Sequence, residues 1–139
     1  VVCRRQRQMC IRDSFMAKRD KTKVRKILLC TGKVYYDLAA KQAADQRDDV
    51  AIIRLEQLYP LPKKQLKAII DAYPSDAPVY WVQEEPANMG AAWHIGFRLR
   101  SWARLRDYVT RQHSASPATG YKKVHQIEQA DIVQRAFAI

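Results

Sequence analysis

The sequence contains VRKILLCT at residues 24–31, a stretch whose centre, Ile27 to Cys30, is apolar without interruption. A strand with one side in water alternates apolar and polar residues, whereas a strand covered on both faces is apolar throughout. The same character recurs in Val50 to Leu55 (VAIIRL) and Val79 to Val82 (VYWV). We therefore predict three buried strands of a mainly parallel sheet.

Each predicted strand is followed by a segment with helical periodicity. Pro62 is suited to open one of these helices, because Leu66 and residues 69, 70 and 73 follow the i, i+3, i+4, i+7 rule. The predicted helices span residues 33–46, about 62–73, a segment between 89 and 105, and 122–137. The buried stripe predicted for the last helix consists of Val124, Ile127, Ala130, Val133 and Phe137.

A short fourth strand is predicted from Asp107 to Thr110, followed by a loop rich in Ser, Pro and Gly at residues 112–120. Strands that alternate with helices predict an α/β fold, because right-handed crossovers place the helices over a parallel sheet. The fold class is therefore α/β: a three-layer, mostly parallel twisted sheet with helices on both faces. The length of 139 residues supports one domain.

The net charge of +11 is concentrated near the N-terminus. Residues 1–26 contain ten of the 25 Lys and Arg residues but two of the 14 Asp and Glu residues. A basic tail binds phosphates without specificity, but aromatic residues that could stack bases are not interleaved with it, so we expect no nucleic-acid partner. Residues 9–14 (MCIRDS) resemble a translated adapter of sequencing libraries. We therefore divide the chain into an artefactual or disordered basic head, residues 1–21, and a domain, residues 22–139, and exclude residues 1–14 from the fold.

Candidate binding residues follow from the expected sheet, since ligands of open α/β sheets bind outside the carboxyl ends of the strands. At Gly32 and Lys33 a helix N-terminus could hold an anion, but a plain strand-to-helix turn is the favoured interpretation. In the loop from Ser114 to Gly120, phosphate binding and helix capping explain the hydroxyl groups equally well. The candidates for an anion or allosteric ligand are Gly32, Lys33, Arg54, Arg111, Ser114, Ser116, Thr119 and Gly120.

Other reactive side chains have simpler structural interpretations. Glu84 and Glu85 are adjacent on an extended chain and point to opposite faces, so we favour a structural or interface role for them. Cys30 ends an apolar run and is predicted to be a buried free thiol. The three His residues are widely spaced and CxxC is absent, so no metal site is expected. No apolar run approaches the ~18 residues of a membrane span.

Four strings in the sequence resemble the C-terminal region of 2-oxoglutarate dehydrogenase E1 subunits. They occur in the family's order and cover nearly all of residues 24–139. The strings are CTGKVYYDL (30–38), DDVAIIRLEQLYPLP (48–62), WVQEEPANMGAAW (81–93) and SASPATGYKKVHQIEQ (114–129). One departure lies at Thr110 to His113, where the family commonly has Gly-Arg-x-x-Ala; Arg111 matches, but the glycine is replaced.

The resemblance implies a domain similar to the transketolase C-terminal domain, within an enzyme of the tricarboxylic acid cycle. In the family, the whole subunit decarboxylates 2-oxoglutarate on thiamine diphosphate with Mg and then succinylates the lipoyl group of E2. The family's catalytic and cofactor residues lie upstream, and the Gly-Asp-Gly motif of thiamine enzymes does not occur in this sequence. We therefore assign no catalytic or cofactor-binding residue and expect the fragment to be inactive alone.

The implied partners are the remainder of the E1 subunit, a second E1 chain in a homodimer, and the E2 succinyltransferase of the full complex. In some members the C-terminal domain contributes to an allosteric site for a nucleotide or acetyl-CoA. The implied location is the bacterial cytoplasm, or the mitochondrial matrix in a eukaryote, without membrane contact.

Three alternatives remain open from the sequence. The first is a stand-alone regulatory module that binds an anion or nucleotide at the strand ends. The second is a basic nucleic-acid binder that uses residues 1–21. The third is a related transketolase-type dehydrogenase for another 2-oxo acid.

Overall fold

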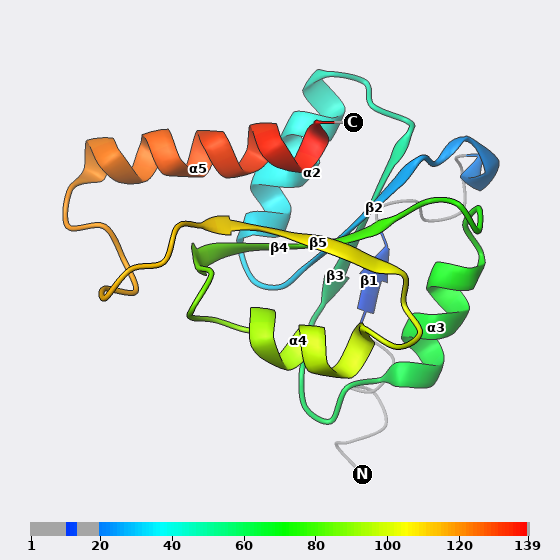
Figure 1. Ribbon diagram of the computed structural model, residues 1–139. Helices are drawn as coiled ribbons and strands as arrows, with labels where there is room; N and C mark the ends of the chain where they lie inside the picture. The colour runs from blue at the N-terminus through cyan, green and yellow to red at the C-terminus, as the bar shows by residue number, and fades with distance from the viewer. Residues whose placement is uncertain (1–10, 14–19, 139) are drawn as a thin grey trace, which may run out of the picture.

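The structure is a computed structural model that describes residues 11–13 and 20–138. Its centre is a five-stranded sheet with strand order β1-β3-β2-β4-β5 (Figure 1). Four strands are parallel, and β1 pairs antiparallel with β3 at one edge. The strands are β1 (Ile11–Asp13), β2 (Lys26–Cys30), β3 (Val50–Leu55), β4 (Val79–Pro86) and β5 (Leu105–Arg111). The predicted mostly parallel sheet is confirmed.

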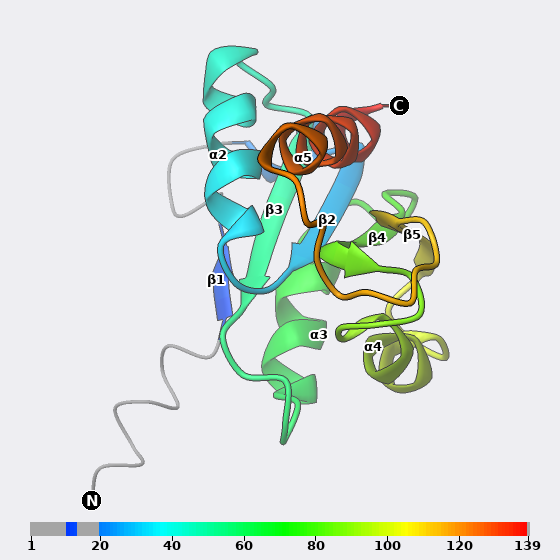
Figure 2. The same cartoon turned by 90° about the vertical axis from the view of Figure 1, so that its left-hand side faces the viewer.

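Helices cover both faces of this sheet (Figures 1 and 2). Residues of α2 (Val34–Ala44) and α5 (Lys122–Phe137) enter one hydrophobic cluster, and residues of α3 (Lys63–Asp71) and α4 (Ala92–Leu99) enter the other. A short 3₁₀ helix, η1 (Lys21–Lys23), precedes β2. The expected three-layer α/β architecture is therefore present.

The apolar run of β2 is explained by this arrangement. Ile27 and Leu29 belong to the cluster under α3 and α4, whereas Leu28 and Cys30 belong to the cluster under α2 and α5. All four residues have no exposed surface. Burial of each such aliphatic side chain stabilises the fold by about 1.5–3 kcal/mol, so a polar residue at any of these positions would disrupt one core or the other.

Several element boundaries differ from the prediction. β4 continues through Pro86, which pairs with Arg111 of β5. The side-chain amide of Gln83, within this strand, accepts from Trp81 Nε1 at 2.9 Å and donates to the carbonyl oxygen of Met89 at 2.8 Å. These bonds satisfy a buried polar side chain that follows the apolar residues 79–82 of the strand. α4 has eight residues, shorter than the predicted segment, and β5 is longer than predicted. β1 lies in the segment that we had excluded from the fold and was not expected.

The stripe predicted for α5 is wrong at Val124, Ile127 and Ala130, which are exposed. Val124 and Ile127 are 42% and 64% exposed, whereas Ile132, outside the predicted stripe, is fully buried. The N-terminal half of α5 extends beyond the sheet, as Figure 1 shows, and only the C-terminal half packs on it. Periodicity identified the helix but not the part of its length that meets the core.

Candidate functional site

The carboxyl ends of β2 and β4 meet in a polar network. Lys33 Nζ lies 3.6 Å from Glu84 Oε1, and the same oxygen accepts from Gln129 Nε2 of α5 at 2.9 Å. The chain passes from β2 to β3 on one side of β2 and then to β4 on its other side. Ligands of open α/β sheets usually bind in the crevice at such a reversal of strand order. Glu84 thus forms an ion pair with the largely exposed Lys33 and joins β4 to α2 and α5, a structural role.

Gly32 lies in the turn between β2 and α2. Its φ of +73° is in the left-handed region, and a Cβ added there would meet nothing within 4 Å. The glycine is therefore required by the backbone conformation and not by close approach of another group. Thr31 Oγ1 donates to the carbonyl oxygen of Leu55 at 2.8 Å and ties this turn to β3. These contacts fit the simpler interpretation, a strand-to-helix turn.

Arg54, at the end of β3, is held by aromatic and acidic neighbours. Its Nη1 donates to the Tyr36 hydroxyl at 3.2 Å, and its guanidinium carbon lies 5.2 Å from the centre of that ring. Its Nε is 3.2 Å from Glu56 Oε1, an ion pair without hydrogen-bond geometry, since Nε is buried with no hydrogen-bond partner. Arg54 does not line the cavities described below.

Arg111, at the end of β5, lines a cavity of about 510 Å³. Its Nε donates to the Glu84 carbonyl oxygen at 2.7 Å, its Nη1 to Glu128 Oε2 at 3.2 Å, and its Nη2 to the carbonyl oxygen of Pro117. The side chain is 11% exposed. One guanidinium thus joins β4, α5 and the connecting loop, which leaves little of it for an external anion. The lining residues are Arg111, Gln112, His113, Ser114, Ala118, Thr119 and Glu128.

The loop hydroxyl groups around this cavity have different roles. Ser114 Oγ accepts from the Ser116 amide at 3.1 Å, and Ser116 Oγ donates to the Ala118 carbonyl oxygen at 2.8 Å, so both shape the loop. Thr119 Oγ1 is buried and has no hydrogen-bond partner among the described residues. Of the eight candidates, the structure brings Arg111, Ser114 and Thr119 to one cavity and leaves the other five outside its lining.

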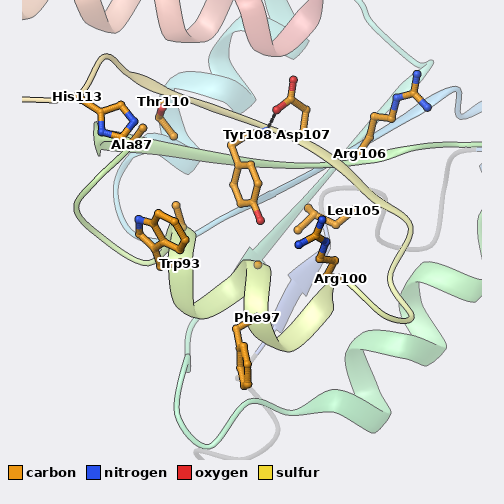
Figure 3. A pocket seen from close by; sticks show the side chains of 12 residues that line it. Ala87, Trp93, Phe97, Arg100, Leu105, Arg106, Asp107, Tyr108, Thr110 and His113 are labelled. Atoms are coloured by element: carbon orange, nitrogen blue, oxygen red, sulfur yellow. Dashed lines mark hydrogen bonds between the residues drawn. The ribbon is translucent and has the colours of Figure 1, made fainter.

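A second cavity, of about 770 Å³, lies between α4 and β5 and was not predicted (Figure 3). Tyr108 points from β5 toward α4, whereas Trp93 and Phe97 project outward from the helix. Trp93 and Phe97 are 74% and 86% exposed. A signal in the sequence could have indicated this surface. Trp93 and Phe97 are four residues apart and therefore lie on one face of the helix, opposite the buried Ile95 and Leu99.

The remaining reactive groups do not form a catalytic centre in residues 11–13 and 20–138. Cys30 is a buried free thiol, as predicted, and burial raises its pKa to about 12, so it is not a nucleophile near neutral pH. In these ranges no three His, Cys, Asp or Glu side chains gather as a metal site. No helix in the described part of the chain has the length and apolar character needed to cross a bilayer.

Comparison with known proteins identifies the family. A family model described as 2-oxoglutarate dehydrogenase C-terminal matches residues 4–137. The multifunctional 2-oxoglutarate metabolism enzyme of Mycolicibacterium vanbaalenii is 46% identical over 123 residues, which is 85% of this chain and 10% of that protein. The enzyme of the same name from Mycobacterium sp. strain KMS is 46% identical over 125 residues, or 86% of this chain and 10% of that protein. This chain spans about a tenth of the length of these curated relatives, and it belongs to the 2-oxoglutarate dehydrogenase C-terminal family.

Proposed function

We propose that this chain completes the E1 subunit that decarboxylates 2-oxoglutarate and succinylates the lipoyl group of E2 in the tricarboxylic acid cycle. The observation that carries the proposal is the family match across residues 4–137, together with relatives whose names place them in 2-oxoglutarate metabolism. The bacterial cytoplasm is the proposed location, or the mitochondrial matrix in a eukaryotic host.

The chemical step is assigned to segments of the subunit outside this chain. Thiamine diphosphate needs Mg, and Mg prefers a set of carboxylate and other oxygen ligands. The cavity between α4 and β5 is lined by aromatic and arginine side chains and by a single carboxylate, Asp107. These residues do not fit a metal-diphosphate group, so no step of the reaction is derived from them.

The contribution of this chain is structural in the proposed scheme. Its sheet, covered on both faces, is a rigid body on which the rest of the subunit and a second E1 chain assemble. The chain alone is therefore expected to be inactive with 2-oxoglutarate, and E2 is a partner through the complete complex.

A chimera of the Mycolicibacterium vanbaalenii relative tests this proposal. Residues 20–139 would replace the segment that they match, and 2-oxoglutarate decarboxylation would be measured with thiamine diphosphate and Mg. We expect activity within about tenfold of the unmodified enzyme, and none from the isolated 139-residue chain. A matched chimera carrying Leu28→Asp, which places a charge in the core, should be inactive. Decarboxylation by the isolated chain would overturn the proposal, as would a folded but inactive chimera.

A second candidate function rests on Thr119. Thr119 lines the polar cavity beside Arg111, its hydroxyl is buried without a hydrogen-bond partner among the described residues, and a buried hydroxyl left unpaired is costly. An anionic ligand such as AMP or acetyl-CoA would supply an acceptor, either as an allosteric effector of the subunit or as the ligand of a stand-alone module. Calorimetric titration of both compounds into the 139-residue chain tests this, with Thr119→Val as the variant that should weaken binding. No heat at millimolar ligand would eliminate the candidate.

A further inference from the structure

The surface around the cavity between α4 and β5, which we call the α4–β5 surface, has the composition of a protein interface. It combines Trp93, Phe97 and Tyr108 with Arg100 and Arg106. Trp, Tyr, Phe and Arg are enriched at the centres of protein interfaces, where Lys and Glu are depleted. Two aromatic side chains more than 70% exposed on one eight-residue helix exceed the scattered apolar residues of an ordinary surface.

One aromatic residue of this surface, Tyr108, packs closely on α4. A Cβ at position 96 would overlap the Tyr108 hydroxyl, so the tyrosine rests directly on the backbone of α4. Gly96 is buried in the middle of the helix, where glycine is unfavourable by about 0.5–1 kcal/mol relative to alanine. The absence of a side chain at this position gives room for the Tyr108 hydroxyl, whose ring lines one wall of the cavity.

The charges of this surface are unbalanced. Arg100 and Arg106 are exposed, and within residues 11–13 and 20–138 neither forms an ion pair. Of the described residues that line the cavity, Asp107 alone carries a carboxylate, and its Oδ1 accepts from the Tyr108 amide at 2.8 Å. A complementary partner is therefore acidic.

β5 is also an edge strand, since it follows β4 at the end of the strand order. The outer backbone groups of an edge strand pair readily with an extended segment of another chain. A second copy of this chain is a poor occupant. A twofold contact would place the same surface on both sides and bring the Arg100 and Arg106 residues of two copies together.

We propose that the α4–β5 surface binds an acidic, extended segment of the same subunit that lies outside this chain. The segment places apolar side chains against Trp93, Phe97 and Tyr108, and carboxylates on Arg100 and Arg106. The inference rests on the proposed function, in which this chain is one domain of a longer subunit, and it deepens that function by naming the docking surface. The coverage of about a tenth of each relative's length supports such a segment.

The test uses the 139-residue chain and, as the probe, the Mycolicibacterium vanbaalenii relative truncated before the segment that this chain matches. Calorimetry would measure their association at about 50 and 300 mM NaCl. We expect Trp93→Ala with Phe97→Ala to weaken binding by at least about tenfold. Arg100→Glu with Arg106→Glu should weaken it similarly and remove most of its salt dependence. Val124→Ser with Ile127→Ser, exposed apolar residues on α5, is the matched control and should leave the affinity unchanged.

Circular dichroism melts would confirm that all variants are folded, which their exposed positions favour. Equal affinity of the aromatic double variant and the wild type would overturn the inference, as would absence of binding at micromolar concentrations. A discrete dimer of the chain at about 150 mM NaCl that Phe97→Ala dissolves would overturn it too, because the occupant would then be a second copy. An active chimera without binding through this surface refutes the inference alone, whereas binding through this surface with a folded, inactive chimera refutes the proposed function alone.

Discussion

At the scale of single residues, Arg111 has a structural role: its guanidinium joins three segments of the chain. It was predicted as an anion-binding candidate from its place at a strand end, and the structure commits its three guanidinium nitrogens to β4, α5 and the loop after β5. Lysine cannot reproduce this planar fork. Arg111→Lys is therefore expected to lower the free energy of unfolding by about 1–3 kcal/mol in urea denaturation. Arg106→Lys, at an exposed arginine of the same strand, should change it by less than about 0.5 kcal/mol. Equal changes in the free energy of unfolding for the two substitutions would contradict this structural role of Arg111.

Asp49 gives a pH-dependent contribution to stability. Arg47 donates to it through Nε at 2.7 Å and through Nη2 at 3.0 Å, and this hydrogen bonding lowers the pKa of Asp49 below its ordinary 3.8. Arg47 Nη1 also donates to the carbonyl oxygen of Phe137 at 3.2 Å, so the pair ties the turn before β3 to the end of α5.

Because the pKa in the folded state is depressed, the stabilisation is complete above 3.8 and is lost as the pH falls through the lower folded value. Asp49→Asn is expected to destabilise the protein by up to about 1 kcal/mol at pH 7, since the pair is partly exposed. The difference from the wild type should shrink steadily below pH 4 in urea titrations. A difference that is constant from pH 7 to pH 3 would show that the charge of Asp49 plays no part, and the exposed Asp76→Asn variant is the control.

At the scale of elements, the sequence predicted strands better than helix faces. β3 was located residue for residue, and β2 was predicted as residues 24–31, three residues longer than observed but with the right apolar centre, because burial on both faces leaves a continuous apolar run. β4 was predicted too short, since its end is polar and pairs with β5 after a register shift, which no apolar pattern in the sequence indicates. The candidate site was predicted only in part for a similar reason: the strand ends could be inferred, but not the ion pair between Glu84 and Lys33.

The last helix offers a direct test of this difference. Ile132 is fully buried and Ile127 is 64% exposed, although periodicity had selected Ile127. Ile132→Ala is expected to lower the free energy of unfolding by about 2–5 kcal/mol through a cavity in the core. Ile127→Ala should change it by less than about 0.5 kcal/mol, because no packed contact is lost. Thermal or urea unfolding of the two variants measures both changes in stability. A larger loss of stability for the variant at position 127 would mean that the N-terminal half of α5 is buried against another surface in solution.

At the scale of the whole molecule, an apolar surface and a strong positive charge act against each other. The net charge of +11 keeps copies of the chain apart at low ionic strength, and the exposed Trp93 and Phe97 favour association once that repulsion is screened. Light scattering of the 139-residue chain should therefore show little association at about 50 mM NaCl and growing, non-stoichiometric association above about 500 mM.

Phe97→Ser should suppress this association without lowering the melting temperature, because the ring is 86% exposed and contributes little to the core. Tyr59→Ser is the matched control: Tyr59 is 77% exposed but lies in the connection between β3 and α3, and it does not line the α4–β5 cavity. If both substitutions reduced the scattering equally, the association would reflect apolar surface in general. If Phe97→Ser alone reduced the scattering, the association would take place through the α4–β5 surface. This result is expected if that surface binds another segment of the subunit, as proposed above.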